Sequence, residues 1–449
     1  MPDWTAYLQN ARRRLGKKTR EADPSRSAFQ RDYDRIIFSA PFRRLQNKTQ
    51  VMPAPKSDEV RNRLTHSLET ASVGRSLGFL AGQFLIERYP ELQSKLKLRP
   101  DDFGYMVSAA ALAHDIGNPP FGHEGEKAVR DFFRSDTGKF YLHRLTPKQQ
   151  ADFLYFEGNA AGLRILAHTT GNNHALRGGL RLSLGTYGAF VKYPKEALPF
   201  RHEEGKRSLK KFGIFQAELK DFEEIARQLQ LIPRFTSDGK AWARFPLAFL
   251  TEAADDICYT VIDYEDAFHL GLTEEKRVTE LLGELARLNR RQQATYKRIA
   301  GTAEKVAYLR SYAINRLINE TVEVFLRNEE AIRSGAFDTA LTDALPSSTR
   351  SVIKEILSES ITKFYHHPTV LKNEAGGKTV IPFLLEKFLQ ARFNPGKFKQ
   401  YELLLPEIYR QSETDYEKVL DTVMFVTGMS DRQAVEWYRN FNGIQLAEH

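Results

Sequence analysis

Cysteine is nearly absent from this sequence, which has one, Cys258, among 449 residues. A single cysteine excludes an intrachain disulfide, so the fold depends on no cross-link of that kind. Cys258 lies between Ile257 and Tyr259, and these neighbours predict a buried thiol without a catalytic role.

Long apolar runs are absent as well. No run approaches the roughly 20 apolar residues that a helix needs to cross a bilayer. An acidic residue, Asp3, comes early, and no apolar core precedes the basic residues 12–14, so a secretory signal is not expected. The two absences together predict a cytoplasmic protein with no membrane partner.

Linkers rich in Gly, Ser or Pro are missing too. The composition, 41% hydrophobic and 27% charged residues, is typical of soluble globular proteins. A chain of this length could form two or three domains. Because no linker divides it, one large body is expected.

Alternating strand patterns are scarce, and the periodicity typical of helices dominates. Apolar residues recur every three to four positions in residues 64–77, 105–116, 247–268, 278–288, 305–325 and 416–426. Residues 178–215 differ, because Gly, Pro and aromatic residues are frequent there, together with basic residues such as Lys192 and Lys211. This segment predicts an extended loop or small hairpin. The fold class predicted for the whole chain is all-α.

Basic residues exceed acidic ones. The counts are 66 Lys and Arg against 57 Asp and Glu, which gives a formal net charge of +9. Such an excess attracts polyanions. Triphosphate substrates and nucleic acids both satisfy this attraction, and charge alone does not distinguish them.

A His-Asp pair stands at the end of a strongly apolar helical stretch. Residues 106–116 are almost wholly small or apolar, and Gly117 with the prolines after it predicts that His114 and Asp115 lie in the last turn of the helix. A buried charge there needs a partner. Imidazole nitrogen and carboxylate oxygen are ligands of divalent cations in hydrolytic sites. An isolated His-Asp pair, however, is more often a surface helix end or a satisfied core pair.

Two further helical stretches carry polar residues at helical spacing. His66 follows Arg63 by three residues, so both can face one side. Asp255, Tyr259 and Asp263 recur every four residues, which places them along one stripe of a helix. The stripe predicts the wall of a pocket, although a tyrosine half-buried at a helix surface is also common.

His123 and Glu126 follow the His-Asp pair at a spacing of three. On a helix the carboxylate can then bind one imidazole nitrogen and leave the other free for proton transfer. The alternative is an N-terminal histidine with a capping glutamate.

These residues occur in an ordered series of motifs that resembles the HD-domain deoxynucleoside triphosphate triphosphohydrolases over essentially the full chain. The motifs are residues 31–51, Arg63-Leu-Thr-His66, Ala113-His114-Asp115-Ile-Gly-Asn118, Gly122-His123-Glu-Gly-Glu126, Phe156-Glu157-Gly-Asn159, Asp255-Asp-Ile-Cys-Tyr259-Thr-Val-Ile-Asp263, residues 365–371 and residues 431–439. The resemblance implies an all-α HD-domain metallohydrolase fold with additional C-terminal helices. It implies an N-terminal helical segment at the substrate site (1–60), an HD phosphohydrolase core (61–270) and a C-terminal helical region packed on that core (271–449).

The same resemblance implies roles for the catalytic residues. The metal ligands would be His66, His114, Asp115 and Asp255, and the acid/base pair would be His123 with Glu126. Mg²⁺ or Mn²⁺ is the expected ion, and the two histidines also admit Fe, Ni, Co or Zn.

Substrate contacts are implied as well. The 3′-hydroxyl of the sugar would bind Gln50 and Asp263, and Tyr259 would pack on the sugar and exclude a 2′-hydroxyl. The phosphates would bind basic side chains, and Asn118 lies near the site in a role that spacing does not assign. The basic side chains are Arg63, Lys192 and Lys211.

The implied reaction is hydrolysis of a deoxynucleoside triphosphate, dGTP or other dNTPs, to deoxynucleoside and tripolyphosphate. Two alternatives stay open. Other HD phosphohydrolases act on monophosphates, cyclic nucleotides or guanosine tetraphosphate with the same four ligands, and a non-catalytic nucleic-acid-binding regulator would suit the net charge. The resemblance also implies a homo-oligomer, often a hexamer, with a nucleotide effector and single-stranded DNA as candidate partners.

Overall fold

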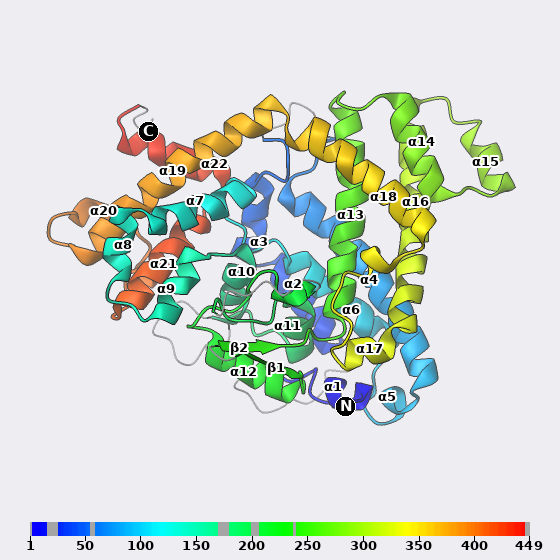
Figure 1. The fold of residues 1–449 in the computed structure, drawn as a ribbon, viewed down its shortest axis with the longest axis horizontal. Coiled ribbons are helices and arrows are strands. Elements are labelled where there is room, and N and C mark those ends of the chain that lie inside the picture. Colours follow the sequence, from blue (N-terminus) through cyan, green and yellow to red (C-terminus); the bar gives the residue numbers. More distant parts are fainter. Residues whose placement is uncertain are drawn as a thin grey trace.

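The computed structural model describes residues 2–15, 26–53, 59–168, 179–198, 206–236 and 239–444. These residues form twenty-two α-helices and a single two-stranded sheet (Figure 1). The predicted all-α fold class is therefore confirmed.

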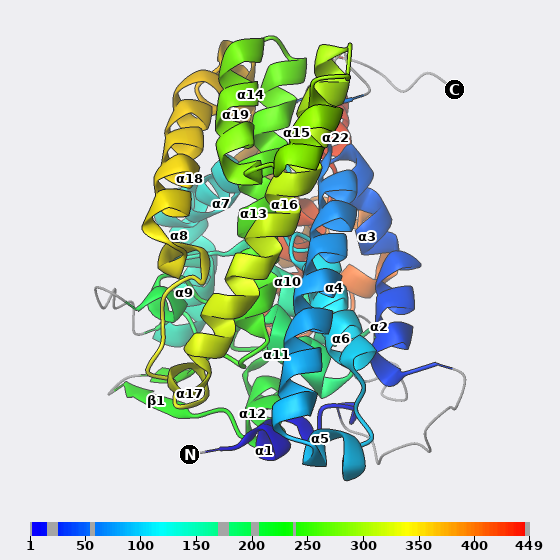
Figure 2. The ribbon, with the colours of Figure 1, turned by 90° about the vertical axis from the view of Figure 1, so that its right-hand side faces the viewer.

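A layer of long helices forms the centre of the molecule. Helix α4 (Arg63–Arg88) packs along α6 (Pro100–Ala113), and α2 (Ala28–Ile37) packs against α6 (Figure 2). The backbones of α4 and α6 approach closely at Gly78, where a Cβ atom would lie 2.5 Å from the carbonyl oxygen of Phe103. Helix α13 (Ala248–His269) contacts both α4 and α6. This contact brings residues distant in sequence to one site.

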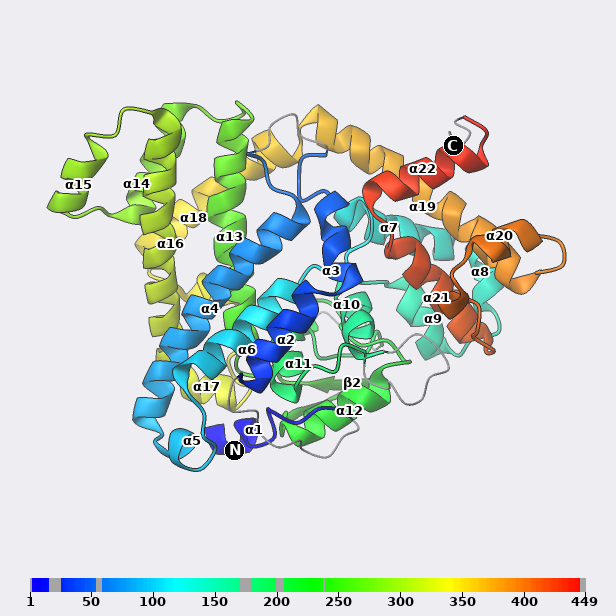
Figure 3. The same cartoon turned by 180° about the vertical axis from the view of Figure 1, so that it is seen from behind.

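A second group of helices packs on α13. It comprises α14 (Glu275–Ala286), α16 (Thr302–Arg327) and α18 (Ser347–Ser360). The short α15 (Arg290–Tyr296) projects at the edge of this group (Figures 1 and 3).

A separate hydrophobic core joins the middle of the chain to its C-terminal helices. Helices α7 (Gly122–Arg134), α8 (Asp136–Leu142) and α9 (Pro147–Leu154) lie with α19 (Pro368–Phe393), α20 (Lys399–Leu404), α21 (Asp415–Thr427) and α22 (Asp431–Phe441) on the left of Figure 1. Their buried side chains include Phe133, Phe153, Phe388 and Val423. The C-terminal helices thus support α7, the helix that carries His123.

The remaining elements are short. The α-helices are α1 (Trp4–Leu8), α3 (Ala40–Arg44), α5 (Glu91–Ser94), α10 (Gly158–Ala167), α11 (Leu184–Phe190), α12 (Leu219–Gln228) and α17 (Glu329–Arg333). The single turns are η1 (Leu45–Asn47), η3 (Arg207–Leu209), η4 (Thr342–Ala344), η5 (Ile361–Tyr365) and η6 (Glu407–Tyr409). The antiparallel strands are β1 (Pro233–Thr236) and β2 (Gly239–Trp242).

Each of the six stretches predicted as helical falls largely within one long helix, respectively α4, α6, α13, α14, α16 and α21. One boundary was predicted wrongly. Helix α6 ends at Ala113 with His114 as its C-cap, so His114 and Asp115 lie just beyond the helix and not in its last turn.

The prediction of a loop or hairpin for residues 178–215 was wrong near its start, where α11 (Leu184–Phe190) is a fully buried helix. Its glycines resemble loop residues in the sequence, but they permit close packing. A Cβ at Gly185 would lie 2.6 Å from Met106 Sδ, and one at Gly188 would lie 2.7 Å from Leu229 Cδ1. Residues 178 and 199–205 of this stretch lie outside the described residues.

Two further expectations can be compared with the structure. Cys258 is a buried free thiol, as predicted. Within the described ranges, no helix has both the length and the apolar character needed to span a membrane.

Candidate active site

Two histidines and an aspartate meet where α4, α6 and α13 come together. Nε2 of His66 lies 3.3 Å from Oδ1 of Asp255, and Nε2 of His114 lies 3.3 Å from the same oxygen. One ligand atom from each of the three residues lies within 4.8 Å of the other two. Three of the four predicted metal ligands therefore form a compact donor group.

The local structure orients His114 toward this group. Nδ1 of His114 lies 2.7 Å from the carbonyl oxygen of Ala111, which requires the proton to be on Nδ1. Nε2 is then the ring nitrogen that faces Asp255. The ring of His114 is therefore oriented as the predicted role of metal ligand requires, with Nε2 toward the other donors.

Asp115, the fourth predicted ligand, lies beside the group. Its Oδ1 is 3.4 Å from Nε2 of His114 and accepts a 2.6 Å hydrogen bond from Nδ2 of Asn118. Its Oδ2 is 2.5 Å from Nη1 of Arg63. Asp115 is therefore adjacent to the three donors but held by two neighbours, and Asn118 orients a predicted ligand.

The charges around the donors keep both aspartates ionised. Burial raises the pKa of Asp255, but Lys192, whose Nζ lies 2.7 Å from Oδ2, and the neighbouring histidines hold it well below its usual range. Burial likewise opposes ionisation of Asp115, and Arg63 and His114 outweigh it, so its pKa is also low. Ionised carboxylates beside imidazole nitrogens suit a divalent cation.

Burial and the neighbouring carboxylates have opposite effects on the pKa of His66. Its burial acts to lower the pKa, whereas the hydrogen bond to Asp255 and the charges of Asp255, Asp263 and Asp115 outweigh burial and raise it. The surroundings of His66 therefore favour a positive charge at the donor group.

His123 and Glu126 form the predicted pair. Nδ1 of His123 lies 3.1 Å from Oε2 of Glu126, and the histidine side chain is 83% exposed while the glutamate is buried. The backbone N–H of Gly158 donates a 2.7 Å hydrogen bond to Oε1 of Glu126. Burial alone would raise the pKa of Glu126, but His123, Lys211 and this N–H hold it below its usual range. Glu126 therefore pairs with Nδ1 of a mostly exposed His123 side chain, and Nε2 takes no part in this pair.

Lys211 lies between two carboxylates. Its Nζ is 2.9 Å from Oε2 of Glu157 and 3.8 Å from Oε2 of Glu126. Burial and the charge of Glu126 raise the pKa of Glu157 despite Lys211. Each cation predicted to bind phosphate is therefore paired with a site carboxylate in this structure.

Gly158 explains the motif at residues 156–159, to which the sequence assigned no role. A Cβ atom there would lie 2.5 Å from Oδ1 of Asn118 and 2.9 Å from Oε1 of Glu126. Any larger residue would displace both side chains, so the motif holds α10 against the loop that carries the site.

A tyrosine that the sequence did not single out joins the stripe on α13. The Tyr365 hydroxyl donates a 2.9 Å hydrogen bond to Oδ2 of Asp263, and its ring stacks on that of Tyr259, with centroids 5.6 Å apart and planes 8° from parallel. Tyr259 keeps 37% of its surface exposed, while Asp263 is buried. Burial raises the pKa of Asp263 to about 7.

Gln50 lies in a segment that pairs with the start of α4. The backbone N–H of Arg63 donates a 3.2 Å hydrogen bond to the carbonyl of Lys48, and Thr49 and Asn62 form an isolated antiparallel β-bridge. Oε1 of Gln50 is buried without a hydrogen-bond partner among the described residues. An acceptor of this kind suits a ligand hydroxyl.

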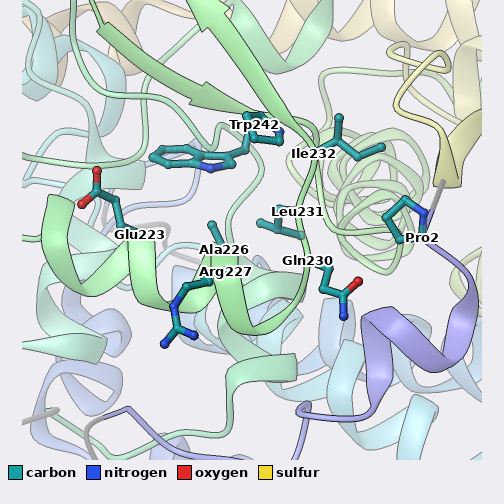
Figure 4. A pocket seen from close by; sticks show the side chains of 9 residues that line it. Pro2, Glu223, Ala226, Arg227, Gln230, Leu231, Ile232 and Trp242 are labelled. Carbon is teal, nitrogen blue, oxygen red and sulfur yellow. The ribbon is translucent and has the colours of Figure 1, made fainter.

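A surface groove lies elsewhere, between α12, the strands and the N-terminus (Figure 4). It contains none of the predicted site residues and is lined by Pro2, Glu223, Ala226, Arg227, Gln230, Leu231, Ile232, Pro233 and Trp242.

The chain is similar to known proteins over nearly its full length. The chain is 40% identical over 460 residues to a "deoxyguanosinetriphosphate triphosphohydrolase-like protein" of Synechocystis sp., with 99% of this chain and 100% of that protein covered. A protein of the same name from Pseudomonas aeruginosa is 37% identical, with 98% and 99% covered.

A "deoxyguanosinetriphosphate triphosphohydrolase" of Salmonella arizonae is 32% identical, with 80% of this chain and 75% of that protein covered. No family model matches the chain. Identity of this level over nearly the whole length identifies the chain as a member of the deoxyguanosinetriphosphate triphosphohydrolase-like family.

Proposed function

We propose that the protein is a metal-dependent hydrolase that converts deoxynucleoside triphosphates, dGTP among them, to deoxynucleoside and tripolyphosphate. The observation that carries the proposal is the convergence of His66, His114 and Asp255, with Asp115 alongside, next to cationic side chains. The names of the relatives support the substrate class.

The residues that would hold the ion are His66, His114, Asp115 and Asp255. When bound, a divalent cation supplies polarisation of the α-phosphate and acidification of water. Arg63 and Lys192 already touch the outer oxygens of Asp115 and Asp255. They therefore stand beside the place that the phosphates would take.

His123 would move the proton. The ion-paired Glu126 fixes its Nδ1, so the other ring nitrogen can deliver a proton to the 5′-oxygen of the leaving deoxynucleoside. The bond from water oxygen to the α-phosphorus would form as the bond from that phosphorus to the 5′-oxygen breaks. The attacking water would release one proton to solvent, and the exposed His123 would regain a proton from solvent after it has protonated the 5′-oxygen. Lys211, beside Glu126, would hold the β- and γ-phosphates.

The sugar would lie against α13. Tyr365 fixes the ring plane of Tyr259 by stacking and donates to one oxygen of Asp263. The 3′-hydroxyl would donate its one proton to Oε1 of Gln50 and would lie beside the other carboxylate oxygen of Asp263. A ring held against C2′ leaves no room for a 2′-hydroxyl.

The test is incubation of the purified protein with each dNTP, with GTP and with dNTP mixtures, adding Mg²⁺ or Mn²⁺, followed by separation of products. Tripolyphosphate and deoxynucleoside from dNTPs but not from GTP support the proposal. Turnover only in mixtures would indicate an effector nucleotide. If no dNTP is consumed under any of these conditions, the proposed function is wrong.

A further inference from the structure

The carboxylate of Asp431, the first residue of α22, bonds to two loops of the candidate site. Its Oδ2 accepts a 3.0 Å hydrogen bond from the backbone N–H of Thr49, and its Oδ1 accepts a 3.1 Å bond from that of Phe121. Thr49 directly precedes Gln50, and Phe121 is two residues before His123. One side chain therefore ties the predicted 3′-hydroxyl contact to the predicted proton donor.

The loop end at Phe121 needs such support. Phe121 is the N-cap of α7 and has a left-handed backbone with φ 62°, which is strained for a residue with a bulky side chain. Its N–H bond to Asp431 and its packing against α19 hold this conformation. A Cβ at Gly377 on α19 would lie 2.9 Å from the Cβ of Phe121.

A second contact joins the same segments. Nζ of the buried Lys48 donates a 2.5 Å hydrogen bond to the carbonyl of Asn118 and a 3.1 Å bond to that of Thr427. Thr427 ends α21, and Asp431 begins α22. The turn between these C-terminal helices therefore contacts the Lys48–Thr49 segment at Thr427 and Asp431, and the loop at Phe121 through Asp431 alone. Lys48 also joins the two segments directly, through its bond to Asn118.

We infer that Asp431 is a positioning residue, which sets the distance between Gln50 and His123 and so couples recognition of the 3′-hydroxyl to proton transfer. The inference rests on the proposed function for its catalytic consequence. The clamp itself, a carboxylate bound to two backbone N–H groups, is a property of the fold.

An ordinary role for Asp431 is to stabilise the N-terminus of α22. The same turn offers a matched control, because Oγ of Ser430 is the N-cap and accepts from the N–H of Gln433. Ser430→Ala weakens α22 and leaves both bonds of Asp431 in place. Asp431→Asn keeps one acceptor oxygen and loses one of the two bonds.

The experiment compares wild type, Asp431→Ala, Asp431→Asn and Ser430→Ala in two readouts. Hydrogen exchange measures the amides of the segments that contain Thr49 and Phe121. Steady-state kinetics measures the ratio of kcat/KM for a dNTP to that for the matching 2′,3′-dideoxynucleoside triphosphate. For Asp431→Ala we expect faster exchange in both segments and a ratio reduced about tenfold, the scale of one lost hydrogen bond to a charged group.

For Asp431→Asn, both the exchange rates and the ratio of kcat/KM values should lie between those of Asp431→Ala and wild type. Ser430→Ala should change neither the exchange rates nor the ratio. Exchange unchanged in Asp431→Ala would overturn the clamp. Faster exchange with an unchanged ratio would overturn the positioning role, as would an equal effect of Ser430→Ala. Failure of the proposed function is separate, because the wild type would then hydrolyse no dNTP while exchange still tests the clamp.

Discussion

The hydroxyl of Tyr365 donates a 2.9 Å hydrogen bond to Asp263 across 102 residues of sequence, and the same ring stacks on Tyr259. Two members of the predicted sugar contact are therefore held by one side chain from η5. This arrangement makes the geometry of the predicted sugar contact depend on the C-terminal half of the chain.

Tyr365→Phe should impair recognition of the sugar while it preserves the stacked ring. Loss of a hydrogen bond to a carboxylate predicts a fall in kcat/KM for dNTPs of about tenfold or more. The matched control is Tyr264→Phe on α13, which loses a 3.0 Å bond to Glu359. Equal kinetics in wild type and Tyr365→Phe would contradict the role given to the hydroxyl.

The raised pKa of Asp263 predicts a pH dependence of stability. Because this pKa is about 7 in the folded protein and about 4 in an unfolded chain, the folded state retains a proton between these values. The group therefore lowers the free energy of unfolding as pH rises from 4 to 7.

Asp263→Asn removes this dependence. The free energy of unfolding of the variant minus that of wild type should therefore be more positive at pH 7.5 than at pH 5, by on the order of 2 kcal/mol. Urea unfolding in the presence of a chelator measures the difference. The same difference at both pH values would show that Asp263 ionises normally.

The ion pair of Lys192 with Asp255 predicts coupling between the two residues. In the metal-free protein, Lys192→Met should cost about 2 kcal/mol, because it leaves a carboxylate without its partner. The cost should shrink when Asp255→Asn is present in the same chain. Lys139→Met, which breaks a pair with Asp136 in which both side chains are exposed, should cost about 1 kcal/mol or less. Additive effects of Lys192→Met and Asp255→Asn would exclude the coupling.

Removal of the predicted metal should abolish activity and spare the fold. A chelator should stop hydrolysis, and added Mn²⁺ or Mg²⁺ should restore it. His114→Ala should lose both bound metal and turnover, whereas His143→Ala, at the exposed C-cap of α8, should lose neither. Calorimetric titration of Mn²⁺ into both variants measures the binding. Unchanged hydrolysis in His114→Ala would contradict the site assignment.

The sequence predicted features that depend on short spacing. The stripe of Asp255, Tyr259 and Asp263 required only helical geometry, and the pairing of His123 with Glu126 required a spacing of three. The bond from Asn118 to Asp115 has the same spacing, and that signal could have indicated its orienting contact.

Contacts between segments that are distant in sequence could not be predicted from local patterns. Tyr365 meets Asp263, and Asp431 meets Phe121 across 310 residues, so no local pattern pairs them. The α11 helix was missed for another reason, because its glycines match those of a loop until their close packing against neighbouring helices is known.

Hydrolysis of dGTP in water enriched in ¹⁸O tests the central claim most directly. The account predicts tripolyphosphate that carries one ¹⁸O atom and unlabelled deoxyguanosine, formed by wild type with a divalent cation and not by His114→Ala. Label in deoxyguanosine, or release of phosphate or pyrophosphate in place of tripolyphosphate, would contradict attack at the α-phosphorus and the function proposed for this site.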